Sequence, residues 1–210
     1  MAKIDFNKLI GVNDSMDAPR ALMAKLYNKE EREAMFKELQ DGGIEWGEDI
    51  FREYFEEELA QRKVMKQDFT PYSVAKLVSK IAGTDGNTLD ICSGTGTIVI
   101  SKWWNDMISS SIFSYKPSQY IYTCEELSDR ALPFLLFNLL IRGVNAVVKH
   151  VDVLTRECKG VFFIQNDKDD YMTYSSFNLM PYNEEVEQYF GVKFTDYRHK
   201  PIIESELKQF

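Results

Sequence analysis

The spacing of apolar side chains divides the chain into two parts with different patterns. Up to residue 66, apolar residues recur every three or four positions without the alternation of a strand, which predicts short amphipathic helices. From Gln67 onward, helical patterns alternate with short apolar runs. That order predicts a parallel sheet with helical crossovers, in which ligands bind at the carboxyl ends of the strands. We therefore expect a helical N-terminal region at 1–66 and an α/β domain at 67–210.

The predicted elements of the α/β domain follow one another closely. Buried strands are expected at 88–92, 120–124, 146–151 and 161–164. Helices are expected at 98–108, at 129–142, and from Thr70-Pro71 through Ile81. The helix at 129–142 is apolar on every side, so it should be covered all round. The tail has a weaker pattern, with short strands expected at 177–180 and 192–194 and a helix at 184–190.

The charge of the chain limits the partners that it can hold by itself. At pH 7 the 210 residues carry a formal net charge of −8, whereas a protein that binds duplex DNA without a partner usually presents a basic face. A local basic patch is still compatible with an acidic total. The apolar content of 44% and the aromatic content of 13% favour a folded globule with a real core.

Cysteine spacing and hydropathy bear on location and on metals. Cys92, Cys124 and Cys158 are separated by 32 and 34 residues, a spacing that fits neither a zinc site nor a disulfide framework. Unpaired cysteines are usual in a reducing compartment, and the sequence shows neither a signal peptide nor an apolar run of membrane-spanning length. We expect a soluble cytoplasmic protein without a bound metal or a membrane partner.

A glycine-containing loop between a predicted strand and a predicted helix is the first candidate for chemistry. The segment 90–97 reads Asp-Ile-Cys-Ser-Gly-Thr-Gly-Thr, and residues without a Cβ let backbone N–H groups come close to a ligand. A dinucleotide-binding fold would need a third glycine at position 99, where the chain has Val99. An Asp followed four residues later by Gly-x-Gly is instead typical of S-adenosylmethionine-dependent methyltransferases.

Flanking segments extend this likeness to one family. The loop at 90–97 and the segment Gln67-Asp68-Phe69-Thr70-Pro71 resemble the Asp-Pro-Ala-Cys-Gly-Thr-Gly-Gly and Gln-Phe-Phe-Thr-Pro motifs of type I restriction modification subunits. Those subunits are adenine-N6 DNA methyltransferases. The run 138–143 is similar to their Asn-Leu/Met-x-Ile-Arg-Gly run. The segment 152–154 is similar to their Gly-Asp-x-Leu motif, with Val151 where glycine is usual. The resemblance covers 67–155.

The resemblance implies a Rossmann-like methyltransferase fold that binds S-adenosylmethionine. Asp90, Gly94 and Gly96 would then receive the amino-acid end of the cofactor. Glu126 would accept hydrogen bonds from both ribose hydroxyls, and Asp152 would bind the adenine amino group. Taken singly, each carboxylate also has a plain structural explanation as a turn cap or a solvated loop residue.

The same resemblance implies a less complete catalytic part of the site. Phe69, Thr70 and Pro71 would close the site from the side. Adenine methyltransferases carry Asn/Asp-Pro-Pro-Phe/Tyr after the fourth strand. There the Asn and a proline carbonyl hold the exocyclic amine, and the aromatic ring stacks on a flipped base. In this chain the fourth predicted strand is followed by Asn166, but neither proline follows it. Asn166 is thus the candidate catalytic residue of a degenerate site.

Two functions are therefore open from the sequence. The first is transfer of a methyl group to adenine N6 in DNA, without a metal and with Asn166 orienting the amine. The second is a catalytically inactive relative that binds a protein partner of a restriction or defence system, which the acidic charge and the missing prolines favour. DNA binding would rely on a partner subunit, and an exposed sheet edge would favour a homodimer. A small gene of this kind suits a bacterium or a bacteriophage.

Overall fold

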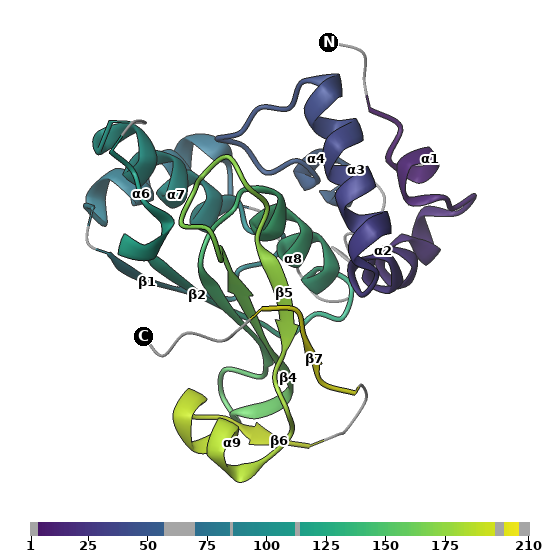
Figure 1. Ribbon diagram of the computed structural model, residues 1–210, viewed down its shortest axis with the longest axis vertical. Helices are drawn as coiled ribbons and strands as arrows, with labels where there is room; N and C mark the ends of the chain where they lie inside the picture. Colours follow the sequence, from purple (N-terminus) through teal and green to yellow (C-terminus); the bar gives the residue numbers. More distant parts are fainter. Residues whose placement is uncertain (1–3, 57–69, 85, 112–113, 196–199, 206–210) are drawn as a thin grey trace.

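A mixed β-sheet forms the centre of the molecule. The computed structural model describes residues 4–56, 70–84, 86–111, 114–195 and 200–205. The strands in this part of the chain are β1 Asn87–Ile91, β2 Ile121–Glu126, β3 Ala146–Val151, β4 Glu157–Gln165, β5 Ser176–Leu179, β6 Lys193–Phe194 and β7 Ile202–Ile203. Their order is β1-β2-β3-β4-β5-β7, and β6 pairs with the start of β4. β1, β2 and β3 run parallel, so their carboxyl ends meet at one edge (Figure 1).

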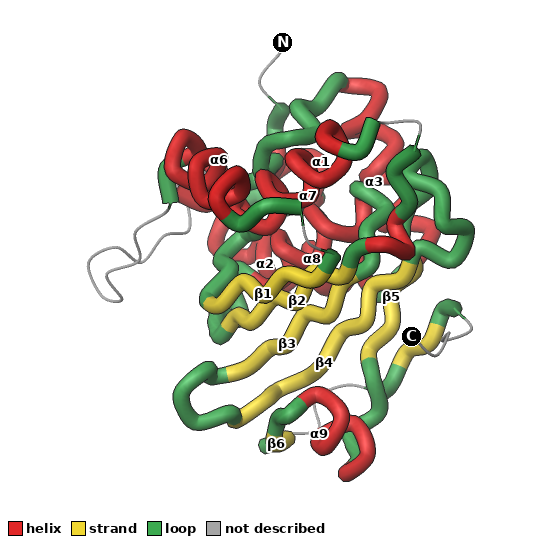
Figure 2. Tube along the Cα trace, turned by 90° about the vertical axis from the view of Figure 1, so that its left-hand side faces the viewer, coloured by secondary structure: helices red, strands yellow, loops and turns green. Residues whose placement is uncertain are grey.

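Most of the described helices lie on one side of this sheet. They are α1 Phe6–Ile10, α2 Ala18–Leu26, α3 Lys29–Gly42, α4 Arg52–Tyr54, α6 Tyr72–Ile81, α7 Thr97–Ser109, α8 Leu132–Ile141 and α9 Glu184–Phe190. Figure 2 shows α1, α2, α3, α6, α7 and α8 gathered on one side of the strands, with α9 beside β4 and β6. The predicted α/β class is confirmed. None of the described helices is both long and apolar enough to span a membrane.

The α8 helix occupies the centre of the helical layer. All ten of its residues are buried, in agreement with the cover expected for a helix that is apolar all round. It packs against α2 and β3. Its Phe134 and Phe137 rings contact Phe51, with centroids 4.9 and 5.0 Å apart. The N-terminal helices thus share one apolar core with α7, α8 and the sheet.

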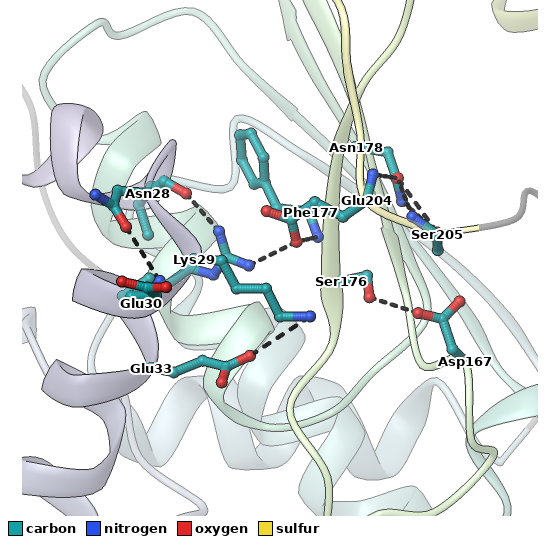
Figure 3. Close-up of polar contacts among 12 residues, drawn as sticks. Asn28, Lys29, Glu30, Glu33, Asp167, Ser176, Phe177, Asn178, Glu204 and Ser205 are labelled. Carbon is teal, nitrogen blue, oxygen red and sulfur yellow. Dashed lines mark hydrogen bonds and ion pairs between the residues drawn. The ribbon is translucent and has the colours of Figure 1, made fainter.

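A buried ion pair ties the C-terminal strands to the N-terminal helices. The Arg32 side chain on α3 is fully buried, and its guanidinium lies 2.6 Å from a carboxylate oxygen of Glu204. The same oxygen accepts a hydrogen bond from Phe177 N at 2.9 Å. Asn178 Oδ1 accepts from the backbone N–H groups of Glu204 and Ser205 (Figure 3). The weakly patterned tail is therefore held by contacts with both β5 and α3.

The expected all-parallel sheet is wrong at β4. This strand runs antiparallel to β3, with Ala146 opposite Ile164. Only residues 152–156 separate the two strands, whereas a parallel crossover needs about a dozen residues or more. The chain therefore turns back as a hairpin instead of crossing over the sheet.

The exposure of β1 differs from the sequence expectation, and α6 is exposed as well. The pattern predicts a buried strand, yet β1 lies at the edge of the sheet, and Leu89 and Ile91 are 58% and 53% exposed. The α6 helix begins at Tyr72 and packs against α7. It buries only the small Ala75 and Ser79, while its apolar stripe is exposed: Val74, Leu77, Val78 and Ile81. Among the described residues, no strand pairs with the outer side of β1.

Candidate cofactor site

The glycine loop joins the carboxyl end of β1 to the amino end of α7. Its backbone is left-handed at Cys92, Gly94 and Gly96, with φ angles of 61°, 58° and 104°. A Cβ added at Gly94 would meet no atom within 4 Å, whereas a Cβ at Gly96 would lie 2.9 Å from the Leu135 side chain. Gly94 therefore leaves room for a ligand, and Gly96 lets the loop pack closely on α8.

Glu126, at the carboxyl end of β2, is joined directly to this loop. One carboxylate oxygen accepts a 2.7 Å hydrogen bond from Gly94 N, and the other accepts a 2.7 Å hydrogen bond from Ser128 N. The backbone N–H of Leu127 also binds this carboxylate, so only part of its acceptor capacity remains for a ligand. The sequence-predicted residues Gly94 and Glu126 thus lie together.

Asp90 lies at the base of the loop with one carboxylate oxygen unsatisfied. The residue is buried, and its Oδ2 has no hydrogen-bond partner, although the backbone N–H of Val99 binds the carboxylate. Burial, and then the nearby charge of Glu126, raise the pKa of Asp90 to about 6. A buried acceptor without a donor is costly, so this oxygen is suited to a cationic or hydrogen-bonding group of a ligand.

The predicted carboxylates converge on Cys92. Partial burial raises the pKa of its thiol, and four neighbouring carboxylates raise it further: Glu126, Asp90, Glu125 and Asp152. Asp152 lies in the β3–β4 turn, where its Oδ1 accepts hydrogen bonds from Leu154 N and Thr155 N at 2.8 and 3.2 Å. Asp152 therefore stands at the same edge of the sheet as the loop and also acts as a turn residue.

The two adjacent glutamates at the end of β2 differ in their partners. Glu125 forms a bidentate pair with Arg156, at 2.7 and 2.9 Å, and lies 3.3 Å from Lys149 Nζ. The Arg156 guanidinium holds the pKa of Glu125 below its ordinary value, assisted by Lys149. Glu125 is thus engaged by cations of the protein itself, and Glu126 is the glutamate with acceptor capacity for a ligand.

Asp49 is a site residue that the sequence pattern did not single out. It precedes α4, and its carboxylate accepts hydrogen bonds from the hydroxyls of Thr95 and Thr97 in the glycine loop. Asn138 Nδ2 on α8 donates to the same carboxylate at 2.7 Å, and Phe51 N donates at 3.1 Å. A single carboxylate therefore fastens the N-terminal helical region to the glycine loop and to α8.

Arg142 extends this network beneath the N-terminal segment. It is buried and donates to Asn138 O and Oδ1 at 2.7 and 2.9 Å, to Trp46 O at 3.0 Å, and to Glu48 O. Burial lowers the pKa of Arg142 to about 9, and the charge of Asp49 opposes this shift. Asn138 and Arg142 could have been noticed in the sequence, because they are two large polar residues four positions apart in an otherwise apolar helical run.

The segment expected to close the site lies only partly within the described residues. Phe69 lies outside them, while Thr70 is half-buried and Pro71 is exposed at the start of α6. The hydroxyl of the next residue, Tyr72, donates to Gly47 O at 3.3 Å. The start of α6 therefore lies beside the N-terminal segment that binds the glycine loop.

Asn166 lies at the opposite end of the strands from the glycine loop. Because β4 is antiparallel to β3, its carboxyl end stands next to Ala146, the first residue of β3. Asn166 N donates to Asn145 Oδ1 at 2.7 Å, and its Nδ2 donates to Gly143 O and Asp170 O at 2.7 and 2.9 Å. These are the contacts of a buried residue that fixes a turn. The catalytic role expected for Asn166 does not fit this position.

Comparison with known proteins gives one family. The family model described as N-6 DNA Methylase matches residues 48–206, which is more than half of the chain. The matched segment begins just before Asp49 and includes the glycine loop, Glu126 and Asp152. No curated protein and no solved structure matches the chain.

Proposed function

The chain belongs to the N-6 DNA methylase family, and from this premise we propose that it binds S-adenosylmethionine at the glycine loop for adenine-N6 methylation of DNA. Within this proposal, Asp90 accepts a hydrogen bond from the ammonium group of the cofactor, and Glu126 accepts from the two ribose hydroxyls. Asp152 binds the adenine amino group. When bound, S-adenosylmethionine would supply an electrophilic methyl group on its sulfonium sulfur, which an amine can accept with release of the thioether.

The unsatisfied Oδ2 of Asp90 is the observation that carries the proposal. The oxygen is buried at the base of the glycine loop, and Gly94 in that loop faces open space. The amino end of α7 begins at the same loop, and the positive end of a helix favours a carboxylate. A zwitterionic amino-acid group has both the cation and the anion that these two features favour.

The position of Asn166 favours a second candidate function, which is cofactor binding without methyl transfer by these 210 residues alone. Adenine methylation requires groups that hold the amine close to the methyl carbon. Asn166 instead holds Gly143 O and Asp170 O, at the far ends of the parallel strands. The cofactor and the acceptor parts of the reaction are thus separable in this chain.

Calorimetric titration with S-adenosylmethionine tests cofactor binding. Glu126→Ala should weaken the affinity by about tenfold to a hundredfold for each of the two ribose hydrogen bonds that it removes, because a hydrogen bond to a charged group contributes about 1.5–3 kcal/mol. Asp90→Ala should weaken it by a similar factor. Glu185→Gln, an exposed change on α9, is the matched control and should leave the affinity unchanged. No heat of binding to the parent protein would refute the proposal.

Transfer of labelled methyl groups to mixed DNA separates the two candidate functions. The chain alone should bind the cofactor and transfer no label. Label transfer that Asn166→Ala abolishes would overturn the second candidate and restore a catalytic role to Asn166. The stability of each variant is measured in parallel, because Asn166 is buried and its replacement also loosens a turn.

A further inference from the structure

A cavity of about 600 Å³ lies between the N-terminal helix α2 and the sheet. Its walls come from α2, from the connection between β2 and α8 with the first turn of α8, and from the facing parts of β3 and β4. The helices α2 and α8 pack on each other, as Figure 1 shows. Pockets for small ligands usually have volumes of about 300–1,000 Å³, so this cavity has the size of a ligand site.

The cavity is separate from the proposed cofactor site. The described residues that line it include none of the four assigned to the cofactor there, which are Asp90, Gly94, Glu126 and Asp152. It lies beyond the end of β2, where the chain has passed Glu126 and turns into α8. A ligand bound here would therefore be additional to S-adenosylmethionine.

The lining of the cavity is basic, although the chain as a whole is acidic. The chain has 33 acidic and 25 basic side chains, whereas the cavity is lined by Arg20, Arg130 and Lys159 and by one acidic residue, Asp129. Lys159 Nζ lies 2.7 Å from the Asp129 carboxylate, so these two charges largely cancel. Arg20 lies on the exposed rim, 4.0 Å from Asp17, and an exposed pair of this kind is weak. The remaining positive charge favours an anion.

Arg130 has no acidic partner in the part of the chain that the structure describes. Its guanidinium donates to Met16 Sδ at 2.9 Å, and a thioether sulfur is only a weak acceptor. The adjacent Asp129 pairs with Lys159 and lies 3.5 Å from His150 Nε2 instead. A guanidinium presents five N–H donors in a planar fork that fits the oxygens of a phosphate or a carboxylate. The half-buried Arg130 can therefore bind the anionic group of a ligand.

The rest of the lining favours an apolar ligand body. Phe162, Leu132 and Pro133 are buried residues of the wall formed by β4 and α8. Met16 and Met23 line the N-terminal side, and methionine side chains adapt to the shape of what they contact. An inorganic ion would leave this apolar surface in contact with water, whereas an aromatic or aliphatic body would remove it from water.

We propose that this cavity binds a small organic anion, in which a phosphate or carboxylate group is attached to an aromatic or aliphatic body. The anionic group binds Arg130, with Arg20 at the rim, and the body lies against Phe162 and Met23. The phosphate backbone of DNA fits less well, because it presents no apolar body to the buried wall. This site goes beyond the proposed function, since none of its groups takes part in cofactor binding.

Naphthyl phosphate is a suitable probe, because it carries both parts of the proposed ligand. Its binding to the full chain is measured by calorimetric titration. Naphthol lacks the anionic group, inorganic phosphate lacks the body, and naphthoate replaces the phosphate by a carboxylate. Naphthyl phosphate or naphthoate should bind at least about tenfold more tightly than naphthol or inorganic phosphate, because each of the latter loses one set of contacts. Equal affinity for naphthol, or equal affinity for inorganic phosphate, would overturn the proposal.

Methyl-labelled methionine locates the probe without any substitution. Met16 and Met23 line the cavity, whereas Met172 is exposed and lies outside it. Naphthyl phosphate should shift the methyl resonances of Met16 and Met23 in the NMR spectrum and leave that of Met172 unchanged. Absence of these two shifts at saturating probe would overturn the proposal, and this result does not depend on the folding of a variant.

Replacement of Arg130 tests the group that binds the anion. Arg130→Gln should weaken the affinity for naphthyl phosphate by about tenfold or more, because a charge-assisted hydrogen bond is lost. Lys116→Gln is the matched control, since Lys116 is an exposed basic residue that does not line the cavity, and its affinity should equal that of the parent. Equal effects of the two substitutions would show a general attraction of anions to basic side chains and would overturn the proposal.

Two competition experiments separate this cavity from the cofactor site and from DNA. Saturating S-adenosylmethionine should not displace naphthyl phosphate, and displacement would place the probe at the glycine loop and overturn the proposal. A duplex oligonucleotide should leave the methyl resonances of Met16 and Met23 unchanged. An oligonucleotide that shifts both resonances and competes with naphthyl phosphate would assign the cavity to DNA instead.

Discussion

Replacement of Asp49 by alanine should both destabilise the fold and weaken the glycine loop. The Asp49 carboxylate accepts from two loop hydroxyls, from Asn138 Nδ2 and from Phe51 N. Alanine removes all four acceptor contacts and leaves the backbone at position 49 unchanged. The two threonine hydroxyls can turn toward other acceptors, but the amide of Asn138 and the N–H of Phe51 have fixed directions.

The magnitude follows from the donors that lose their acceptor. Each buried donor left unsatisfied costs about 1–3 kcal/mol, so the fixed donors of Asn138 and Phe51 together predict a loss of about 2–6 kcal/mol in the free energy of unfolding. Removing the charge of Asp49 also removes a favourable influence on the buried Arg142, which adds to the loss. Burial of Asp49 acts in the opposite direction and reduces the expected loss. Burial raises the pKa of Asp49 and makes its charged form less favourable. We therefore retain the range set by the hydrogen bonds.

Denaturant unfolding of the parent and of Asp49→Ala measures the loss directly. Asp17→Ala is the matched control, since Asp17 is exposed, lies 4.0 Å from Arg20 and makes no side-chain cap to α2. An exposed pair of this kind contributes about 0–1 kcal/mol. The double substitution of Asp49 and Asn138 completes a cycle, in which a coupling of about 0.5–3 kcal/mol is expected for residues in contact.

The same variant tests whether Asp49 positions the glycine loop or only stabilises the fold. If Asp49 positions the loop, Asp49→Ala should also lower the affinity for S-adenosylmethionine under conditions where the protein is still folded. A change in unfolding free energy below about 1 kcal/mol would refute the hydrogen-bond reasoning. Unchanged cofactor affinity together with a large loss of stability would refute the positioning role and leave Asp49 with a purely structural role.

Three further predictions concern other buried polar groups. The pKa of Asp90 is raised to about 6, so its contribution to stability is present below the unfolded pKa, near pH 4, and is lost as pH rises to about 6. Asp90→Asn should therefore reduce the change in unfolding free energy between about pH 4 and about pH 6. The cofactor affinity of the parent should rise over the same interval. Glu204→Ala leaves Arg32 buried without its partner and should cost about 3–5 kcal/mol by thermal or chemical unfolding, whereas an equal stability would contradict the ion pair. Asn166→Ala should cost about 1–3 kcal/mol and leave the calorimetric cofactor affinity unchanged, and a selective loss of affinity would show that Asn166 reaches the site.

The parts of the fold that follow from local pattern were predictable from sequence. The all-round apolar α8 helix is buried as expected, and the strands β2 and β3 fall within one or two residues of their predicted ranges. Local periodicity determines which residues form an element and which side of it is apolar. It does not specify the neighbour of that element, so the apolar residues of β1 predicted burial where the structure has exposure.

The candidate site likewise has one part that local motifs predict and one part that depends on contacts between distant segments. The glycine loop and Glu126 are adjacent because the carboxyl ends of parallel strands meet at one edge, and this part could be predicted from motif order. Asp49 could not be predicted, because its contacts with Thr95 and Asn138 bring together segments more than forty residues apart in sequence. No local pattern in the N-terminal region indicates which surface its short helices cover.

The short connection between β3 and β4 determines which strand stands at the edge of the sheet. Only the five residues 152–156 connect β3 to β4, and the chain bends back within them. A chain that turns back there pairs with β3, so it can reach neither the outer side of β1 nor the glycine loop with the end of that strand. At the end of β4, Asp167 accepts hydrogen bonds from the side chains of Gln165 and Ser176. The free edge of β1 is therefore a consequence of this short connection, because the chain that leaves β3 continues on the side of β3 away from β1.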